Sequence, residues 1–196
     1  IIYDDYLDWL KRGANGLQLT PDDVALGCAQ NDVILPYPAR LLVGTSEQQF
    51  LTYHPPRLLE VVYRAFEVLY PDRPSLRDFM RSSRTDLYGN MAILRRDLLD
   101  DYCRFLFPLL EQARQDPYID IYLKGLDPDQ QNLVYGFNSR WAGFWGERLF
   151  NYYATTVWLN DDAIKTGYWH MLWFDANPAH NNCHTPEAIR DFLQSR

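Results

Sequence analysis

The segment 139–159 constrains the fold most, because it is apolar on almost every side of a helix. Its central stretch, GFWGERLFNYY at residues 143–153, consists largely of aromatic, leucine and glycine residues around one adjacent pair of charges. A helix that is hydrophobic all round belongs in the interior of a protein. The segment therefore predicts a helix surrounded by other elements, and its charged residues need an explanation.

The charged residues of this segment are Arg140, Glu147 and Arg148. A carboxylate in an apolar interior costs several kcal/mol unless it is paired or neutralised. Arg140 lies two helical turns before Glu147, so the two share a face at helical spacing. Two interpretations remain open. Glu147 belongs either to a structural ion pair that tethers the helix to a neighbour, or to a cleft where it acts as a general base beside an arginine that holds phosphate.

Composition limits the class of protein. The chain has 196 residues, of which 47% are hydrophobic and 15% aromatic, and its net charge is −7 without a basic face. This composition predicts a single globular domain over residues 1–196 and argues against a nucleic-acid partner. No apolar run approaches the ~18 residues that span a bilayer. The three cysteines are widely spaced, which is typical of a reducing compartment and favours a cytoplasmic location.

The remaining patterns predict a helix-rich α/β protein, α+β-like, with a small sheet. Ser46 and Gln49 have the spacing of a capping box at the start of one of the helices. We expect 116–132 to be a polar loop. The expected helices are 3–11, one from Thr20, one from Ser46, 55–70, 75–81, 97–114, 139–159 and one from Thr185. The expected strands are 32–36, 87–94 and 168–174.

Two further groups of residues are candidate metal ligands. His180, Cys183 and His184 resemble a partial zinc site, but no fourth ligand is apparent, so a polar loop is the favoured interpretation. Asp127 and Asp129 have DxD spacing, which suits Mg²⁺ or Mn²⁺ but also marks a turn. There is no Gly-rich phosphate loop, and no nucleophile–base arrangement stands out, so spacing alone does not give a reaction.

Two stretches resemble a bacterial family of capsular and exopolysaccharide-biosynthesis glycosyltransferases that is catalogued as a domain of unknown function. The first is YGNMAILRRDLLDDYCRFLFPLL, from Tyr88, and the second is RWAGFWGERLF, from Arg140. The stretch DVILP and the residues Glu47–His54 resemble the family's middle section, so the similarity covers roughly residues 20–155. The matching residues are Asn90, Met91, Tyr102, Cys103, Gly143, Phe144, Glu147, Arg148 and Leu149.

The resemblance implies transfer of a sugar from a nucleotide-sugar donor to a glycan acceptor on a GT-A-like scaffold, of which this chain resembles the later, C-terminal portion. Glu147 resembles the acid that deprotonates the acceptor hydroxyl in GT-A enzymes. Arg148, Arg140, Asn90 and Trp145 are the expected substrate-binding residues. His170 is the expected ligand of a Mn²⁺ or Mg²⁺ ion that accompanies the donor. The family's His-Tyr-Arg-Arg-Tyr-like motif and nucleotide-binding region do not occur in this chain.

A different class of function also fits the sequence. The 6 tryptophans and 14 tyrosines offer stacking surfaces for sugars without any catalysis. The alternative is therefore a non-catalytic, helix-rich module that binds carbohydrate or another protein. For the enzyme we expect a cytoplasmic location that includes peripheral association with the inner face of the membrane.

Overall fold

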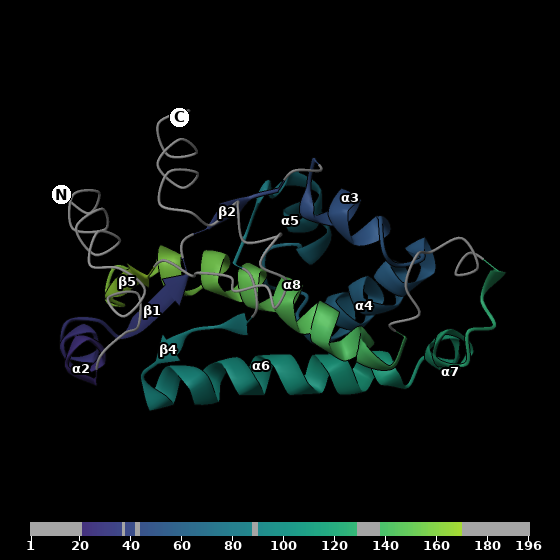
Figure 1. The fold of residues 1–196 in the computed structure, drawn as a ribbon. Helices are drawn as coiled ribbons and strands as arrows, with labels where there is room; N and C mark the ends of the chain where they lie inside the picture. The colour runs from purple at the N-terminus through teal and green to yellow at the C-terminus, as the bar shows by residue number, and fades with distance from the viewer. Residues whose placement is uncertain (1–20, 37, 42–43, 88–89, 129–137, 170–196) are drawn as a thin grey trace, which may run out of the picture.

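The structure is a computed structural model that describes residues 21–36, 38–41, 44–87, 90–128 and 138–169. Helices predominate in these ranges, together with two small sheets, which confirms the expected helix-rich α/β class (Figure 1). The α-helices are α2 (Pro21–Gln30), α3 (Ser46–Leu51), α4 (Pro56–Leu69), α5 (Leu76–Ser82), α6 (Arg96–Arg114), α7 (Pro117–Leu123) and α8 (Trp141–Thr156). The 3₁₀ turns η4 (Asn138–Arg140) and η5 (Trp158–Asn160) flank α8.

The apolar segment forms α8, which runs through the middle of the described fold (Figure 1). Helix α6 lies alongside it, and α4 and α5 pack on its other sides. Trp145, Leu149 and Tyr152 are completely buried, and Tyr152 contacts aromatic rings of α4, α5 and α6. The prediction of an interior helix is therefore correct, and α3, α4, α5 and α6 all contact α8.

The larger sheet has three strands in the order β4–β1–β5. Its central strand β1 (Val33–Pro36) is buried throughout, as expected from the run of apolar residues. It pairs antiparallel with β4 (Ile93–Leu94) and parallel with β5 (Thr166–Trp169). The expected strand at 168–174 thus begins two residues early, and its end lies outside the described residues. The smaller sheet pairs β2 (Ala39–Arg40) with β3 (Thr85–Asp86). Of the segment 87–94, expected as a strand or an extended turn, only Ile93–Leu94 is a strand among the described residues, as β4.

The structure corrects two local predictions. The capping box of α3 is formed by Thr45 and Gln48 rather than by Ser46 and Gln49. The expected loop at 116–132 contains the helix α7, which Asp116 caps by accepting a hydrogen bond of 2.9 Å from the amide of Tyr118. Tyr118 and Tyr122, one helical turn apart, are both buried against the core. This apolar face stabilises the helix, although the polar residues on either side of it in the sequence led to the prediction of a loop. The helices expected at 3–11 and from Thr185 lie outside the described residues.

Candidate functional site

The middle of α8 brings a buried and an exposed charge together. The side chain of Glu147 is 31% exposed, whereas that of Arg148 is 9% exposed. Successive residues of a helix point about 100° apart, so α8 directs Arg148 into the protein and Glu147 towards its surface. The nearest atoms of the pair, Glu147 Oε2 and Arg148 Nη1, are 3.8 Å apart, which is too far for a hydrogen bond.

The guanidinium of Arg148 is held from two other elements. Its Nη1 donates to Oδ2 of Asp86 in β3, and its Nη2 donates to Oε1 of Gln49 in α3. Asn151, one turn further along α8, donates to the backbone oxygen of Thr85 over 2.9 Å and fixes β3 against the helix. The structural ion pair expected in this segment therefore exists, but Arg148 and Asp86 form it.

Asp86 is completely buried, and burial raises the pKa of its carboxyl group. The positive charge of Arg148 opposes this increase in pKa, while the negative charge of Glu147 adds to it. Glu147 and Asp86 therefore repel one another across the same guanidinium. Arg148 Nε has no hydrogen-bond partner among the described residues, so the cluster is only partly satisfied.

The side chain of Asn90 lies against α8 at Gly146, the residue before Glu147. Its backbone has φ 51°, in the left-handed region, where asparagine is more common than most residues. Its side chain is exposed, and Nδ2 would lie 3.3 Å from a Cβ atom added to Gly146. The hydroxyl of Tyr102 approaches the carbonyl oxygen of Gly146 from α6, at 3.4 Å. The missing side chain of Gly146 thus allows a close approach of the Asn90 carboxamide to α8, at the residue before Glu147.

The profile of the family described as "Domain of unknown function (DUF4422)" matches residues 3–158. The chain belongs to the DUF4422 family. Asp86, Asn90, Glu147 and Arg148 all lie within the matched region, whereas β5 follows it. No curated protein and no solved structure matches this chain.

Arg140 and Trp145, the other predicted substrate-binding residues of this DUF4422 chain, differ from one another in exposure. Arg140 is exposed at the start of α8, where its guanidinium lies 5.7 Å from the centre of the Phe144 ring. Trp145 is completely buried between Phe50 and Tyr63, with ring centres 4.8 and 6.1 Å away. Arg140 is thus accessible to a ligand, while Trp145 packs in the core with no exposed face.

The metal predictions concern residues that are partly outside the described ranges. His170, His180, Cys183, His184 and Asp129 all lie there. Asp127 is buried and accepts a hydrogen bond from the hydroxyl of Tyr118. Among the described residues, no group of three or more His, Cys, Asp or Glu side chains is arranged to hold a metal ion.

His54 is a buried residue at the edge of this cluster. Its Nδ1 lies 3.0 Å from the hydroxyl of Tyr122, and its ring packs against Phe50 and Phe144. Burial, together with the smaller effect of the positive charge of Arg148, lowers the pKa of His54 to about 4. His54 is therefore neutral at pH 7 and links α7 to the helices around Arg148.

The sequence does not single out Asp86, Gln49 or His54 as members of one cluster. Asp86 is 62 residues from Arg148, and Gln49 is 99 residues from it. Asp86 follows several arginines in an otherwise polar stretch, where a carboxylate is expected to be exposed. The one available signal was the unpaired charge of the apolar helix, which required a partner somewhere in the chain.

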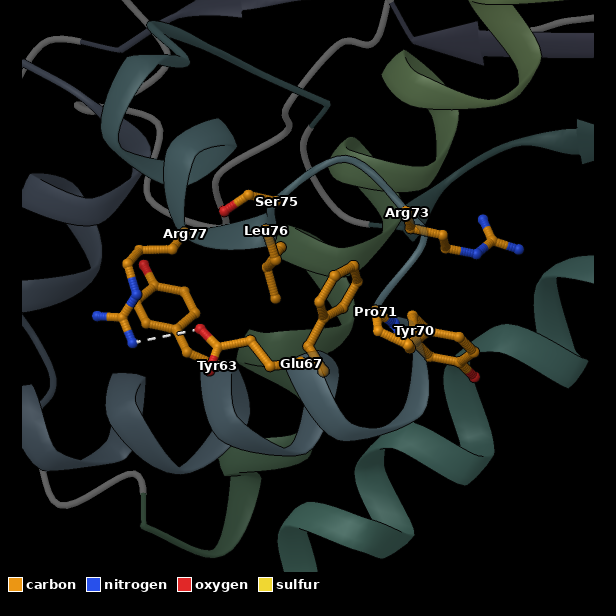
Figure 2. Close-up of a pocket in the computed structure, with 9 residues that line it drawn as sticks. Tyr63, Glu67, Tyr70, Pro71, Arg73, Ser75, Leu76 and Arg77 are labelled. Carbon is orange, nitrogen blue, oxygen red and sulfur yellow. Dashed lines mark ion pairs between the residues drawn. The ribbon is translucent and has the colours of Figure 1, made fainter.

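A separate cavity of about 270 Å³ opens between α4 and the start of α5 (Figure 2). Its walls combine the aromatic residues Tyr63, Phe66 and Tyr70 with Arg77 and Glu67. Arg77 lies 4.5 Å from the centre of the Tyr63 ring and bonds both carboxylate oxygens of Glu60, at 2.7 and 3.0 Å. None of the predicted site residues lines this cavity, so the cavity and the Glu147 cluster are distinct features.

No helix among the described residues is long and apolar enough to cross a membrane.

Proposed function

We propose that this DUF4422 domain is the acceptor side of a glycosyltransferase that moves a sugar from a nucleotide-sugar donor to a glycan acceptor in capsular or exopolysaccharide biosynthesis. The proposal begins from the resemblance of the Asn90 and Glu147 motifs to such enzymes. The observation that supports it most is the environment of Glu147. Its carboxylate is partly exposed, and Arg148 is hydrogen-bonded to Asp86 and Gln49 instead.

In this reaction Glu147 accepts the proton of the acceptor hydroxyl. The hydroxyl oxygen forms the new bond to the anomeric carbon as the bond from that carbon to the nucleoside diphosphate breaks. A general base must lie within hydrogen-bond reach of the proton that it removes, so it needs an accessible carboxylate. Asn90, whose exposed carboxamide lies beside Gly146, is suited to orient the acceptor through hydrogen bonds. Arg140, exposed at the start of α8, is suited to pair with a phosphate group.

The donor implies Mn²⁺ or Mg²⁺, with His170 as the proposed ligand. The described residues contain no group of three or more His, Cys, Asp or Glu side chains arranged around such an ion. Cytoplasmic location and association with the inner membrane face belong to the same proposal, since nucleotide sugars are cytoplasmic donors in this scheme.

Glu147→Gln tests the catalytic role in the full-length protein. We expect transfer, measured as nucleoside diphosphate released from a panel of nucleotide sugars with a glycan acceptor, to fall by about 10²–10⁴-fold. The melting temperature should change little, because the side chain is partly exposed and Gln preserves its shape. Glu111→Gln, an exposed glutamate of α6, is the matched control and should transfer normally.

Full transfer by a folded Glu147→Gln variant would eliminate the role of Glu147. Binding of glycans without release of nucleoside diphosphate from any donor would instead favour the alternative, a non-catalytic carbohydrate-binding or interaction module. A thermal-shift series with the same nucleotide sugars, with and without Mn²⁺, separates these outcomes because a ligand of the native state raises its apparent stability.

A further inference from the structure

Arg148 lies within 4 Å of two carboxylates, and it bonds only one of them. The same atom, Nη1, donates to Asp86 Oδ2 and stands 3.8 Å from Glu147 Oε2. We propose that Asp86 is a positioning residue that holds the guanidinium of Arg148, and thereby keeps the carboxylate of Glu147 free of a hydrogen bond to Arg148 and available to accept a proton. This inference rests on the proposed function of Glu147.

The difference in burial explains why Arg148 hydrogen-bonds Asp86 and not Glu147. Asp86 has no exposed side-chain surface, so water cannot solvate its charge in place of Arg148. The side chain of Glu147 is 31% exposed and has water as an alternative partner. The pairing of β3 with β2, and the bond from Asn151 to Thr85, hold Asp86 in place against α8. The buried pair is therefore the one that persists, and Glu147 remains open.

Gln49 fixes the other end of the same group. It accepts from Nη2, which orients the plane of the guanidinium and keeps it directed at β3 and α3. Gln49 is neutral, however, so Asp86 supplies the negative charge that balances Arg148 in the interior. Without that charge, Glu147 becomes the carboxylate within reach among the described residues.

Removing the charge of Asp86 should therefore change Glu147 in a defined direction. In Asp86→Asn the guanidinium loses its charged partner, so Glu147 becomes the carboxylate that attracts it. The repulsion between the two carboxylates also disappears. Both changes favour the ionised form of Glu147 and make it a weaker base. A merely structural role for Asp86 predicts no directed change in the titration of Glu147.

The test is the ¹³C NMR titration of the Glu147 carboxyl group in the full-length protein, assigned with Glu147→Gln. We expect its midpoint in Asp86→Asn to move to lower pH by about one unit, since an adjacent opposite charge has effects of that size. Transfer should fall together with the midpoint. Asp120→Asn, which removes a carboxylate from the exposed pair with Arg114 on α7, is the control and should leave the midpoint unchanged.

The double variant Asp86→Asn/Gln49→Glu moves the negative charge to the other end of the guanidinium. It keeps Arg148 paired, so it should fold even where Asp86→Asn does not. We expect the Glu147 midpoint to return towards the parental value, and transfer to recover in part. A midpoint that does not shift in folded Asp86→Asn, or that stays shifted in the double variant, would overturn the proposal. Because the titration does not require transfer, it tests the positioning role of Asp86 separately from the proposed activity.

Discussion

Glu147 and Arg148 are adjacent in sequence but meet opposite environments. Helical geometry points one towards the surface and the other into the core, where Asp86 and Gln49 receive it. Each charge then has its own explanation. Arg148 connects α8 to β3 and α3, whereas the carboxylate of Glu147 stays 3.8 Å from Nη1 of Arg148, beyond hydrogen-bond distance.

His54 makes the free energy of unfolding depend on pH. Its folded pKa of about 4 lies below the ordinary histidine pKa of 6.5, so the unfolded chain binds the proton more readily. The stability is therefore complete above about pH 6.5 and is lost as the pH falls towards 4, by up to about 3 kcal/mol. Urea unfolding from pH 7 to 4 measures this dependence.

The matched variant for this prediction is His54→Gln, which can still hydrogen-bond the hydroxyl of Tyr122. Other carboxyl groups titrate in the same range, so the informative quantity is the difference between the two proteins. We expect a shallower loss of stability in the variant below pH 6.5. Identical slopes for both proteins would show that His54 is not the group responsible.

Gly146→Ala separates stability from function at one position. Among the described residues, an added Cβ would meet Asn90 Nδ2 alone, at 3.3 Å, and Asn90 is an exposed side chain that can move. Since alanine is favoured over glycine in a helix by about 1 kcal/mol, we expect the melting temperature to stay the same or rise. Transfer should weaken, with a higher KM for the acceptor, because the carboxamide is displaced.

Gly143→Ala provides the control in the same helix. A Cβ at that position meets nothing within 4 Å, so the variant should gain stability without any effect on KM. Equal KM values for both alanine variants would show that the position of Asn90 does not matter for the acceptor.

At the scale of elements, predictability followed the length of the apolar pattern. The helices α4, α6 and α8 have several turns of apolar spacing, and each lies within two or three residues of its predicted limits. Helix α7 has only two turns, and a Pro and an Asp at its start resemble a loop. The pairs β2–β3 and β1–β5 join segments far apart in the chain, so no local pattern could have predicted them.

Helix α6 contains a defect that can be repaired. Pro108 lies in its interior and is exposed, and it cannot donate a hydrogen bond to the carbonyl oxygen of Arg104. We expect Pro108→Ala to raise the free energy of unfolding by about 1–3 kcal/mol, because proline is the least favourable residue inside a helix. Urea unfolding measures it, with the exposed Glu111→Ala of the same helix as a control that should change by less than about 0.5 kcal/mol. A loss of stability in Pro108→Ala would mean that the helix requires this proline.

For the whole molecule, the interior helix and the helix-rich class were evident from the sequence, but the site was only partly so. Glu147 and Arg148 were conspicuous as charges in an apolar segment. Their relationship was not, because it depends on Asp86 and Gln49, which tertiary packing brings to them. Trp145 illustrates the opposite error, since an aromatic residue beside a candidate acid is as suited to the core as to a sugar.

Trp145 tests the cohesion of that core. It is completely buried against Phe50 of α3 and Tyr63 of α4, so Trp145→Ala leaves a large cavity where three helices meet. We expect a loss of about 3–5 kcal/mol in the free energy of unfolding. Trp145→Phe should lose less and retain transfer if the residue only packs. A stable Trp145→Phe variant with greatly reduced transfer would instead assign the indole ring to substrate binding, as the sequence suggested.

The parallel pairing of β1 with β5 has a consequence for synthesis of the protein. Asp32, just before β1, bonds the amide of Lys165, 133 residues later, just before β5. While the ribosome is still making the intervening helices, the edge of the apolar strand Val33–Pro36 that pairs with β5 remains uncovered. Such an edge invites association with other nascent chains. Strand β5 thus covers this edge late in synthesis, and the protein's exposure to aggregation should end only once β5 has emerged.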